Sequence, residues 1–155
     1  MLRKNPPEKI RSRGGRFAIV ASRYNHRYVE AMLRAAKTEI HRAGGALQVV
    51  RVPGAYEIPV VAARLARTSS PPLSAIICLG VILRGATAHA QHIGEAVSSA
   101  LAQIQIRHEV PVIHEVLLLE NEQQARERCL DRNHNRGTEA AQTALAMARV
   151  MTGLP

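Results

Sequence analysis

Residues Ser74–His89 read SAIICLGVILRGATAH. The segment begins with apolar and β-branched side chains, which are typical of a strand buried on both faces. Gly80 and Gly85 then bracket a turn whose small residues allow an anion to approach the backbone closely. His89 follows at the start of a helix-like segment. This order of strand, turn and proton-transfer group indicates an enzyme that acts on a small phosphorylated molecule.

The same alternation of strand and helix continues on both sides of this segment. Apolar runs predict strands at residues 16–22, 47–52, 74–80 and 110–118, and helical periodicity predicts helices at 26–43, 57–67, 88–107, 122–130 and 136–151. Because crossovers of this length join parallel strands, the sequence predicts an α/β fold with a four-stranded parallel sheet and helices on both faces. Ligands bind beyond the carboxyl ends of the strands in such sheets, so function is expected there.

Composition favours one domain built around an aliphatic core. The chain has 155 residues, of which 46% are hydrophobic and only 3% aromatic. Residues 1–15 form a predicted basic extension, and residues 16–155 form the single domain. More than half of the net charge of +9 lies in residues 1–16. No aromatic side chain interleaves with those basic residues, which argues against a nucleic-acid function.

The cysteines, histidines and apolar runs argue against a disulfide-rich, secreted, membrane-spanning or metal-binding protein. Cys78 and Cys129 are too few for a disulfide framework. The basic start lacks the apolar stretch of a secretory signal, and no apolar run is long enough to span a bilayer, so a cytoplasmic protein is expected. His89 and His92 lack a third ligand at a suitable spacing, so no metal site is expected.

The turn before the third predicted helix is the first candidate site. Gly85, Ala86 and Thr87 are small, and Thr87 is placed to cap the helix, whose free amides favour an anion. The alternative is a simple tight turn. The sequence argues against a Walker-type nucleotide site, because Ala86 and Thr87 stand where Lys and Ser or Thr are needed. In the first helical turn, where the helix dipole disfavours a cation, His89 is a candidate proton relay; the alternative is an ordinary surface histidine.

Three further features are candidates for substrate contact. Glu57 follows the second strand and can accept hydrogen bonds from a polyol, or it complements the helix dipole. Tyr24 follows the first strand and can stack on a flat ring, or it packs ordinarily. Arg128, Arg132 and Arg136 recur every four residues, so on one helix they would share a face that holds phosphate or is merely solvated.

Two of these segments carry a resemblance to a known family. Val52–Pro59 (VPGAYEIP) and Gly80–His89 (GVILRGATAH) closely resemble the two signature segments of the lumazine synthases. The resemblance continues in register from about Arg16 to Met151. Supporting matches lie at 22–25 (SRYN), 110–113 (VPVI), 127–128 (ER) and 135–137 (NRG).

The resemblance implies both a reaction and an assembly. The family condenses 5-amino-6-(ribitylamino)uracil with 3,4-dihydroxy-2-butanone 4-phosphate, giving 6,7-dimethyl-8-ribityllumazine, phosphate and water in the penultimate step of riboflavin synthesis. No cofactor or metal is used. The implied fold is a flavodoxin-like three-layer sandwich. The implied assembly is a pentamer, or in some members a dimer of pentamers or a shell of sixty subunits, with active sites between neighbouring subunits.

The resemblance also implies roles for individual residues. Tyr24 would stack on the pyrimidine, and His89 would relay protons. The ribityl and pyrimidine pocket would be lined by Ala55, Tyr56 and Glu57, and the uracil edge would meet backbone groups of Val81, Ile82 and Leu83. The phosphate would be held by Gly85, Ala86, Thr87 and Arg128. His114 and Arg128 would reach in from the adjacent subunit.

The sequence departs from the family pattern at two of these places. His114 stands where the family usually has an aromatic residue that covers the pyrimidine, and Ala90 stands where Phe or Tyr often follows the catalytic histidine. Three other functions remain open from sequence: a non-catalytic shell protein of the same fold, a nucleic-acid module that uses the basic extension, and a riboflavin synthase of the archaeal type.

Overall fold

A single parallel sheet organises the chain, as the sequence predicts. The computed structural model describes residues 14–155, so the predicted extension lies outside the described residues except for Gly14 and Gly15. The strands lie in the order β2-β1-β3-β4, and every neighbouring pair is parallel. Their bounds are Arg16–Ser22 (β1), Ala46–Val52 (β2), Ala75–Leu83 (β3) and Val112–Leu119 (β4).

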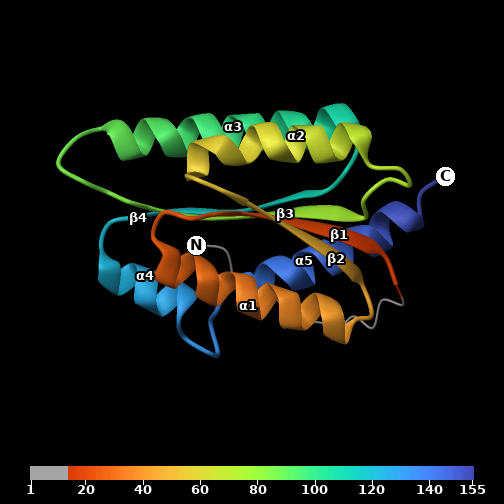
Figure 1. Ribbon diagram of the computed structural model, residues 1–155, viewed down its shortest axis with the longest axis horizontal. Coiled ribbons are helices and arrows are strands. Elements are labelled where there is room, and N and C mark those ends of the chain that lie inside the picture. The colour runs from red at the N-terminus through yellow and green to blue at the C-terminus, as the bar shows by residue number, and fades with distance from the viewer. Residues whose placement is uncertain (1–13) are drawn as a thin grey trace.

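Helices cover both faces of the sheet and complete a three-layer sandwich (Figure 1). One layer holds α2 and α3, and the other holds α1, α4 and α5. The helix bounds are His26–Arg42 (α1), Ile58–Thr68 (α2), His89–His108 (α3), Glu122–Cys129 (α4) and Arg136–Thr152 (α5), with a short 3-10 helix, η1, at Ala55–Glu57. No helix within residues 14–155 combines the length and the hydropathy needed to cross a membrane.

The two faces of the central strands build two separate cores. Along β1, Ile19 packs into the α1 and α5 side, whereas Val20 packs into the α2 and α3 side. Such alternation in a strand buried on both faces explains why its sequence is apolar throughout. Burial raises the pKa of Cys78 to about 12 and that of Cys129 to about 11, so both thiols stay protonated and unreactive at neutral pH.

The layer of α1 and α5 is held together by close backbone packing. Helix α5 presents a face of small residues to its neighbours, including Gly137, Ala140 and Ala144. A Cβ added at Gly137 would overlap the backbone carbonyl of Met32 on α1. Only glycine therefore allows this approach.

The third strand is longer than the sequence predicts. We expected it to end at Gly80, but it continues to Leu83 because its last residues pair with Leu117–Leu119 of β4. The pairing of β3 with β1, by contrast, ends at Leu79. The end of β3 therefore has a bonded partner on one side only.

Candidate active site

The carboxyl ends of the four strands lie at one edge of the sheet, on the left in Figure 1. From β1 the chain continues to β2 on one side, whereas β3 and β4 lie on the other side of β1. The strand order therefore reverses between β1 and β3. In parallel sheets, the crevice at such a reversal of strand order is the usual place for a ligand. The sequence-predicted site residues near positions 24, 55–57, 81–83 and 85–89 all lie in segments that meet this edge.

The loops after β1 and β2 are joined, and they would form one wall of such a crevice. The amide of Tyr24 donates to the carbonyl of Pro53 at 3.1 Å. The carboxylate of Glu57 accepts the amide of Gly54 at 2.9 Å. A Cβ at Gly54 would lie 2.9 Å from both Glu57 Oε2 and Tyr24 Cδ2. Glycine at this position thus brings the predicted stacking ring and the predicted polyol acceptor side by side.

Tyr24 and Tyr56 leave much of their surface free at this wall. The two residues are 70% and 60% exposed, respectively, whereas Ala55 is buried. Helix η1, which carries Tyr56 and Glu57, contacts β1, β3 and α3. Two large exposed aromatic rings in a chain so poor in aromatics are available to contact a ligand or a partner subunit.

The end of β3 lies between these loops and β4, where it would form the floor of such a crevice. The side-chain amide of Asn25 donates to the carbonyl of Val81 at 2.7 Å, so that carbonyl is already engaged. Residues two apart in a strand direct their backbone groups to the same side. Leu83 therefore points its N–H and C=O toward the β1 side, where β3 has no partner strand. Asn25 has a left-handed backbone (φ 54°), which asparagine tolerates.

The loop from β3 to α3 leaves the same edge and would form the opposite wall. Arg84 fastens it, since its guanidinium lies 3.0 Å from Glu120 and donates to Gln91 at 2.9 Å. Within the described residues, the amides of Gly85 and Ala86 have no acceptor. A Cβ at Gly85 would meet nothing within 4 Å. Packing within the chain does not explain this glycine, and open space lies beside it.

Helix α3 begins one residue later than the sequence predicts. Ala88, and not Thr87, is the N-cap. The hydroxyl of Thr87 accepts a long bond of 3.4 Å from the amide of His89, which is the first residue of the helix. His89 is exposed beside the open amides of the loop. The loop, the helix start and the imidazole thus lie in consecutive positions at the same edge of the sheet.

His114 lies apart from this cluster, within β4. Its Nε2 is 2.7 Å from the hydroxyl of Ser98 on α3, and its Nδ1 accepts the amide of Val116 at 3.2 Å. Partial burial lowers the pKa of His114, although part of the residue is exposed. A cavity of about 360 Å³ lies next to it, between α3 and β4, lined by Gln91, Gly94, Glu95, Ser98, Val116 and Leu118.

Arg128 lies on α4, in the layer on the opposite face of the sheet from α3. It is exposed. The predicted shared arginine face does not form, since α4 ends at Cys129 and Arg136 begins α5. Arg136 instead binds the buried carboxylate of Glu115 through two hydrogen bonds of 3.0 Å. Burial raises the pKa of Glu115 despite this attraction.

Sequence reasoning missed several supporting residues. Asn25, Arg84 and Ser98 hold a site segment or a site side chain through contacts with residues distant in the sequence. Asn25 lies in a quoted motif, but nothing in the sequence indicates that its amide reaches β3. No metal-ligating cluster of three His, Cys, Asp or Glu residues occurs in the part of the chain that the structure describes.

Comparison with known proteins gives one consistent result. A family model described as 6,7-dimethyl-8-ribityllumazine synthase matches residues 14–152. The protein of that name from Aquifex aeolicus is 40% identical over 149 residues, which cover 94% of this chain and 96% of the relative. Proteins of the same name from Xanthomonas oryzae and Xanthomonas euvesicatoria are 37% and 36% identical over the same shares.

Proposed function

The chain belongs to the 6,7-dimethyl-8-ribityllumazine synthase family, and we propose that it condenses its two substrates in the crevice at the carboxyl edge of the sheet. It is a transferase of riboflavin biosynthesis that joins 5-amino-6-(ribitylamino)uracil to 3,4-dihydroxy-2-butanone 4-phosphate. One observation carries the placement of the site: the wall with Tyr24 and Glu57 and the wall with His89 belong to loops that leave the same edge of the sheet.

The pyrimidine substrate is assigned to the first wall and the floor. The exposed ring of Tyr24 offers a stacking surface beside the Glu57 carboxylate, which accepts hydrogen bonds from the ribityl hydroxyls. Ala55 and Tyr56 complete this wall. Among Val81, Ile82 and Leu83, the open backbone of Leu83 is best placed for the uracil edge, since the carbonyl of Val81 already accepts from Asn25.

The phosphorylated substrate is assigned to the second wall. The unpaired amides of Gly85 and Ala86, the hydroxyl of Thr87 and the N-terminus of α3 together favour a dianion. His89 lies next to this anion site, where its ring exchanges protons with the substrate. During imine formation it takes a proton from the attacking amine and returns it to the departing water. In the later elimination it takes a proton from the carbon next to the imine carbon, the C–O bond to the phosphate breaks as the new C=C bond forms, and the proton passes to the leaving phosphate.

Holding the reactants together accounts for most of the catalysis. The nucleophilic amine and the ketone are both reactive in themselves. Confining them in attack geometry contributes effective molarities on the order of 10⁵ M or more, whereas a positioned proton relay contributes about 10²–10⁴-fold. The proton relay by His89 is therefore the smaller contribution to the rate.

A complete site requires a second copy of the chain. Arg128 lies on α4 and His114 contacts Ser98 of α3, and these two helices cover opposite faces of the sheet. We assign both to the site of a neighbour: Arg128 reaches its phosphate, and His114 covers its pyrimidine. The assembly is a homopentamer, alone, as a dimer of pentamers or as a shell, and the enzyme works in the cytoplasm without a cofactor.

Mixing the purified protein with both substrates tests the reaction directly. Fluorescence of the lumazine product should appear together with free phosphate. Absence of product, with the native particle intact by light scattering, would leave only a shell protein of the same fold. Riboflavin formed from lumazine alone would instead indicate a riboflavin synthase of the archaeal type. Light scattering should give a mass that is a multiple of five chains.

A further inference from the structure

A buried carboxylate lies where β4, α4 and α5 meet. Glu115 of β4 is 7% exposed, and it is the one charged side chain that is buried within residues 14–155. Arg136, the first residue of α5, binds both oxygens of this carboxylate at 3.0 Å. The third nitrogen of the same guanidinium donates to Glu139 at 2.8 Å. Two carboxylates therefore hold Arg136 in one orientation.

Stability alone does not account for this buried ion pair. Replacing such a pair by apolar side chains of similar volume often leaves a protein equally stable or makes it more stable. Loss of one partner, by contrast, leaves a charge in the interior and is strongly destabilising. The surroundings of Glu115 are therefore the place to look for a functional reason.

Arg128 belongs to the same group of charges but is not bonded to Glu115. It lies in the last turn of α4, directly before the buried Cys129. Its positive charge counteracts the rise in the pKa of Glu115 that burial causes, as the charge of Arg136 does. Among the described residues no carboxylate forms an ion pair with Arg128, and this residue is exposed.

The backbone around Arg128 is fixed by Asn135. The side-chain amide of Asn135 donates to the carbonyl of Cys129 at 2.7 Å, and its Oδ1 accepts the amide of Gly137 at 2.8 Å. These two bonds fasten the last turn of α4 to the first turn of α5. The rotamer of one exposed side chain therefore decides how close the guanidinium of Arg128 comes to Glu115.

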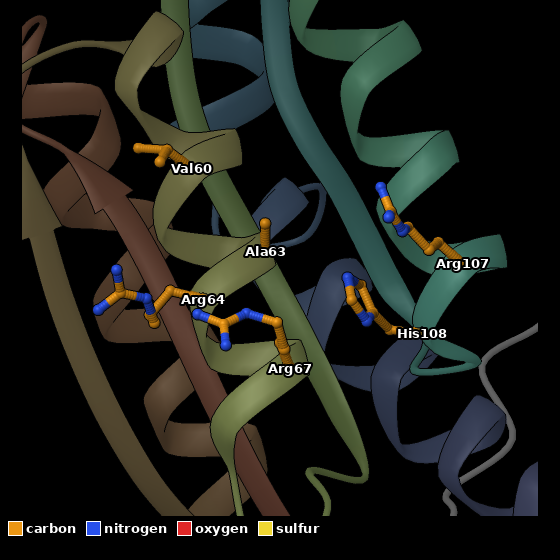
Figure 2. Close-up of a pocket in the computed structure, with 6 residues that line it drawn as sticks. All are labelled: Val60, Ala63, Arg64, Arg67, Arg107 and His108. Atoms are coloured by element: carbon orange, nitrogen blue, oxygen red, sulfur yellow. The ribbon is translucent and has the colours of Figure 1, made fainter.

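Exposed arginines on the other face of the sheet lie in a different setting. Arg64, Arg67 and Arg107 line a cavity of about 360 Å³ between α2 and α3, and their guanidinium groups do not converge (Figure 2). Their charges do not act on Glu115, whereas that of Arg128 does. In the part of the chain that the structure describes, Arg128 thus combines an unpaired guanidinium with a buried carboxylate that attracts it.

We propose that Arg136 is a positioning residue for the reaction: it occupies Glu115, so that Arg128 stays directed toward the phosphate of the neighbouring site. This inference rests on the role proposed above for Arg128. Without Arg136, the buried carboxylate would bind the cation that its charge already attracts, and Arg128 would turn inward. Arg136 therefore acts through Arg128 and does not contact the substrate.

Steady-state kinetics of the native assembly, with each substrate varied in turn, tests the proposal. Arg136→Gln should raise the KM for the butanone phosphate by about tenfold, because the bond from Arg128 is lost, and should leave the KM for the pyrimidine unchanged. Glu115→Gln/Arg136→Gln should restore the wild-type value, since no carboxylate remains to bind Arg128. Arg126→Gln is the matched control, because it breaks a surface ion pair with Glu122 on the same helix.

The Arg128→Ala background separates action through Arg128 from direct contact with the substrate. In that background, adding Arg136→Gln should not raise the KM for the butanone phosphate any further. A further rise would mean that Arg136 binds the substrate itself, and it would overturn the inference. If Arg128→Ala alone leaves this KM unchanged, the proposed role of Arg128 fails and the inference fails with it.

Two other outcomes would overturn the inference and leave the role of Arg128 standing. One is a wild-type KM for the butanone phosphate in Arg136→Gln. The other is a rise of both KM values, without recovery in the double variant, which would show that Arg136 only stabilises the fold. Light scattering checks the assembly of each variant. Where Arg136→Gln does not assemble, Arg136→Lys takes its place, and its single contact should give a smaller rise of the same KM.

Discussion

The imidazole of His114 on β4 and the hydroxyl of Ser98 on α3 are joined by a 2.7 Å hydrogen bond. Since His114 Nδ1 accepts the amide of Val116, the proton of the neutral ring lies on Nε2 and is donated to Ser98. The Ser98 hydroxyl in turn donates to the carbonyl of Gly94 at 2.7 Å. The ring at the position where the family usually has an aromatic residue is thus held neutral and in one orientation.

The substitution Ser98→Ala should therefore loosen the ring without unfolding the protein. We expect stability to fall by about 1 kcal/mol, the usual worth of one hydrogen bond. If His114 covers the pyrimidine of the neighbouring site, the KM for the pyrimidine should rise more than kcat falls. Steady-state kinetics with each substrate varied in turn measures this split. Ser99→Ala, which alters the adjacent exposed serine of α3, should leave both constants unchanged.

Acidification should act on the same contact. Burial lowers the pKa of His114 below 6.5, so the unfolded chain binds this proton at a higher pH than the native chain does. Stability should consequently fall as the pH decreases from about 6.5 toward the native pKa, and level off below it. Urea unfolding across this range at fixed protein concentration measures the effect. His114→Phe should remove this part of the pH dependence, and an unchanged slope would contradict the assignment.

The strands and helices were predictable because each has a strong local pattern. Residues 16–22 and 136–151 are identified to within a residue, since apolar runs and helical stripes specify burial directly. The end of β3 was not predictable. A glycine such as Gly80 often ends a strand, and the pairing of Val81–Leu83 with β4 depends on residues more than thirty positions away. The break between the helices at 122–130 and 136–151 was predictable as well, and it separates three arginines that would share a face only within a single helix.

The site was predictable in part for the same reason. Motifs identified the loops at the carboxyl edge, and Tyr24, Glu57 and His89 lie in the loops or helix starts expected for them. Contacts between distant segments had no local signal: the amide of Asn25 on the carbonyl of Val81, and Ser98 against His114.

Gly137 is the position at which an added side chain should destabilise the fold most. Its substitution by Ala places a methyl group against the carbonyl of Met32 and forces α5 away from α1. We expect a loss of about 3 kcal/mol or more, at the upper end for overpacked cores. For a chain of this size that lowers the melting temperature by roughly 6 °C or more. Calorimetry measures it, and Gly153→Ala, at the open end of α5, should change little.

Arg128 provides a test of the shared site. Arg128→Ala should raise the KM for the butanone phosphate by about tenfold or more, because a charge-assisted bond to the phosphate is lost. The KM for the pyrimidine should stay near its wild-type value. Arg126→Ala is the matched control on α4, since that arginine pairs with Glu122 at the surface. An unchanged requirement for the butanone phosphate would remove Arg128 from the site.

The variant His89→Ala separates the contribution of proton transfer from that of holding the reactants together. His89→Ala removes the proton relay but leaves both walls of the crevice intact, so kcat should fall by about 10²-fold or more while measurable turnover remains. The KM values should change little, because binding rests on the loop amides and the Tyr24 and Glu57 wall. His92→Ala, one turn further along α3 and also exposed, is the control and should retain full activity. Complete loss of turnover in His89→Ala, with both substrates still bound, would mean that proton transfer rather than confinement of the reactants carries the reaction.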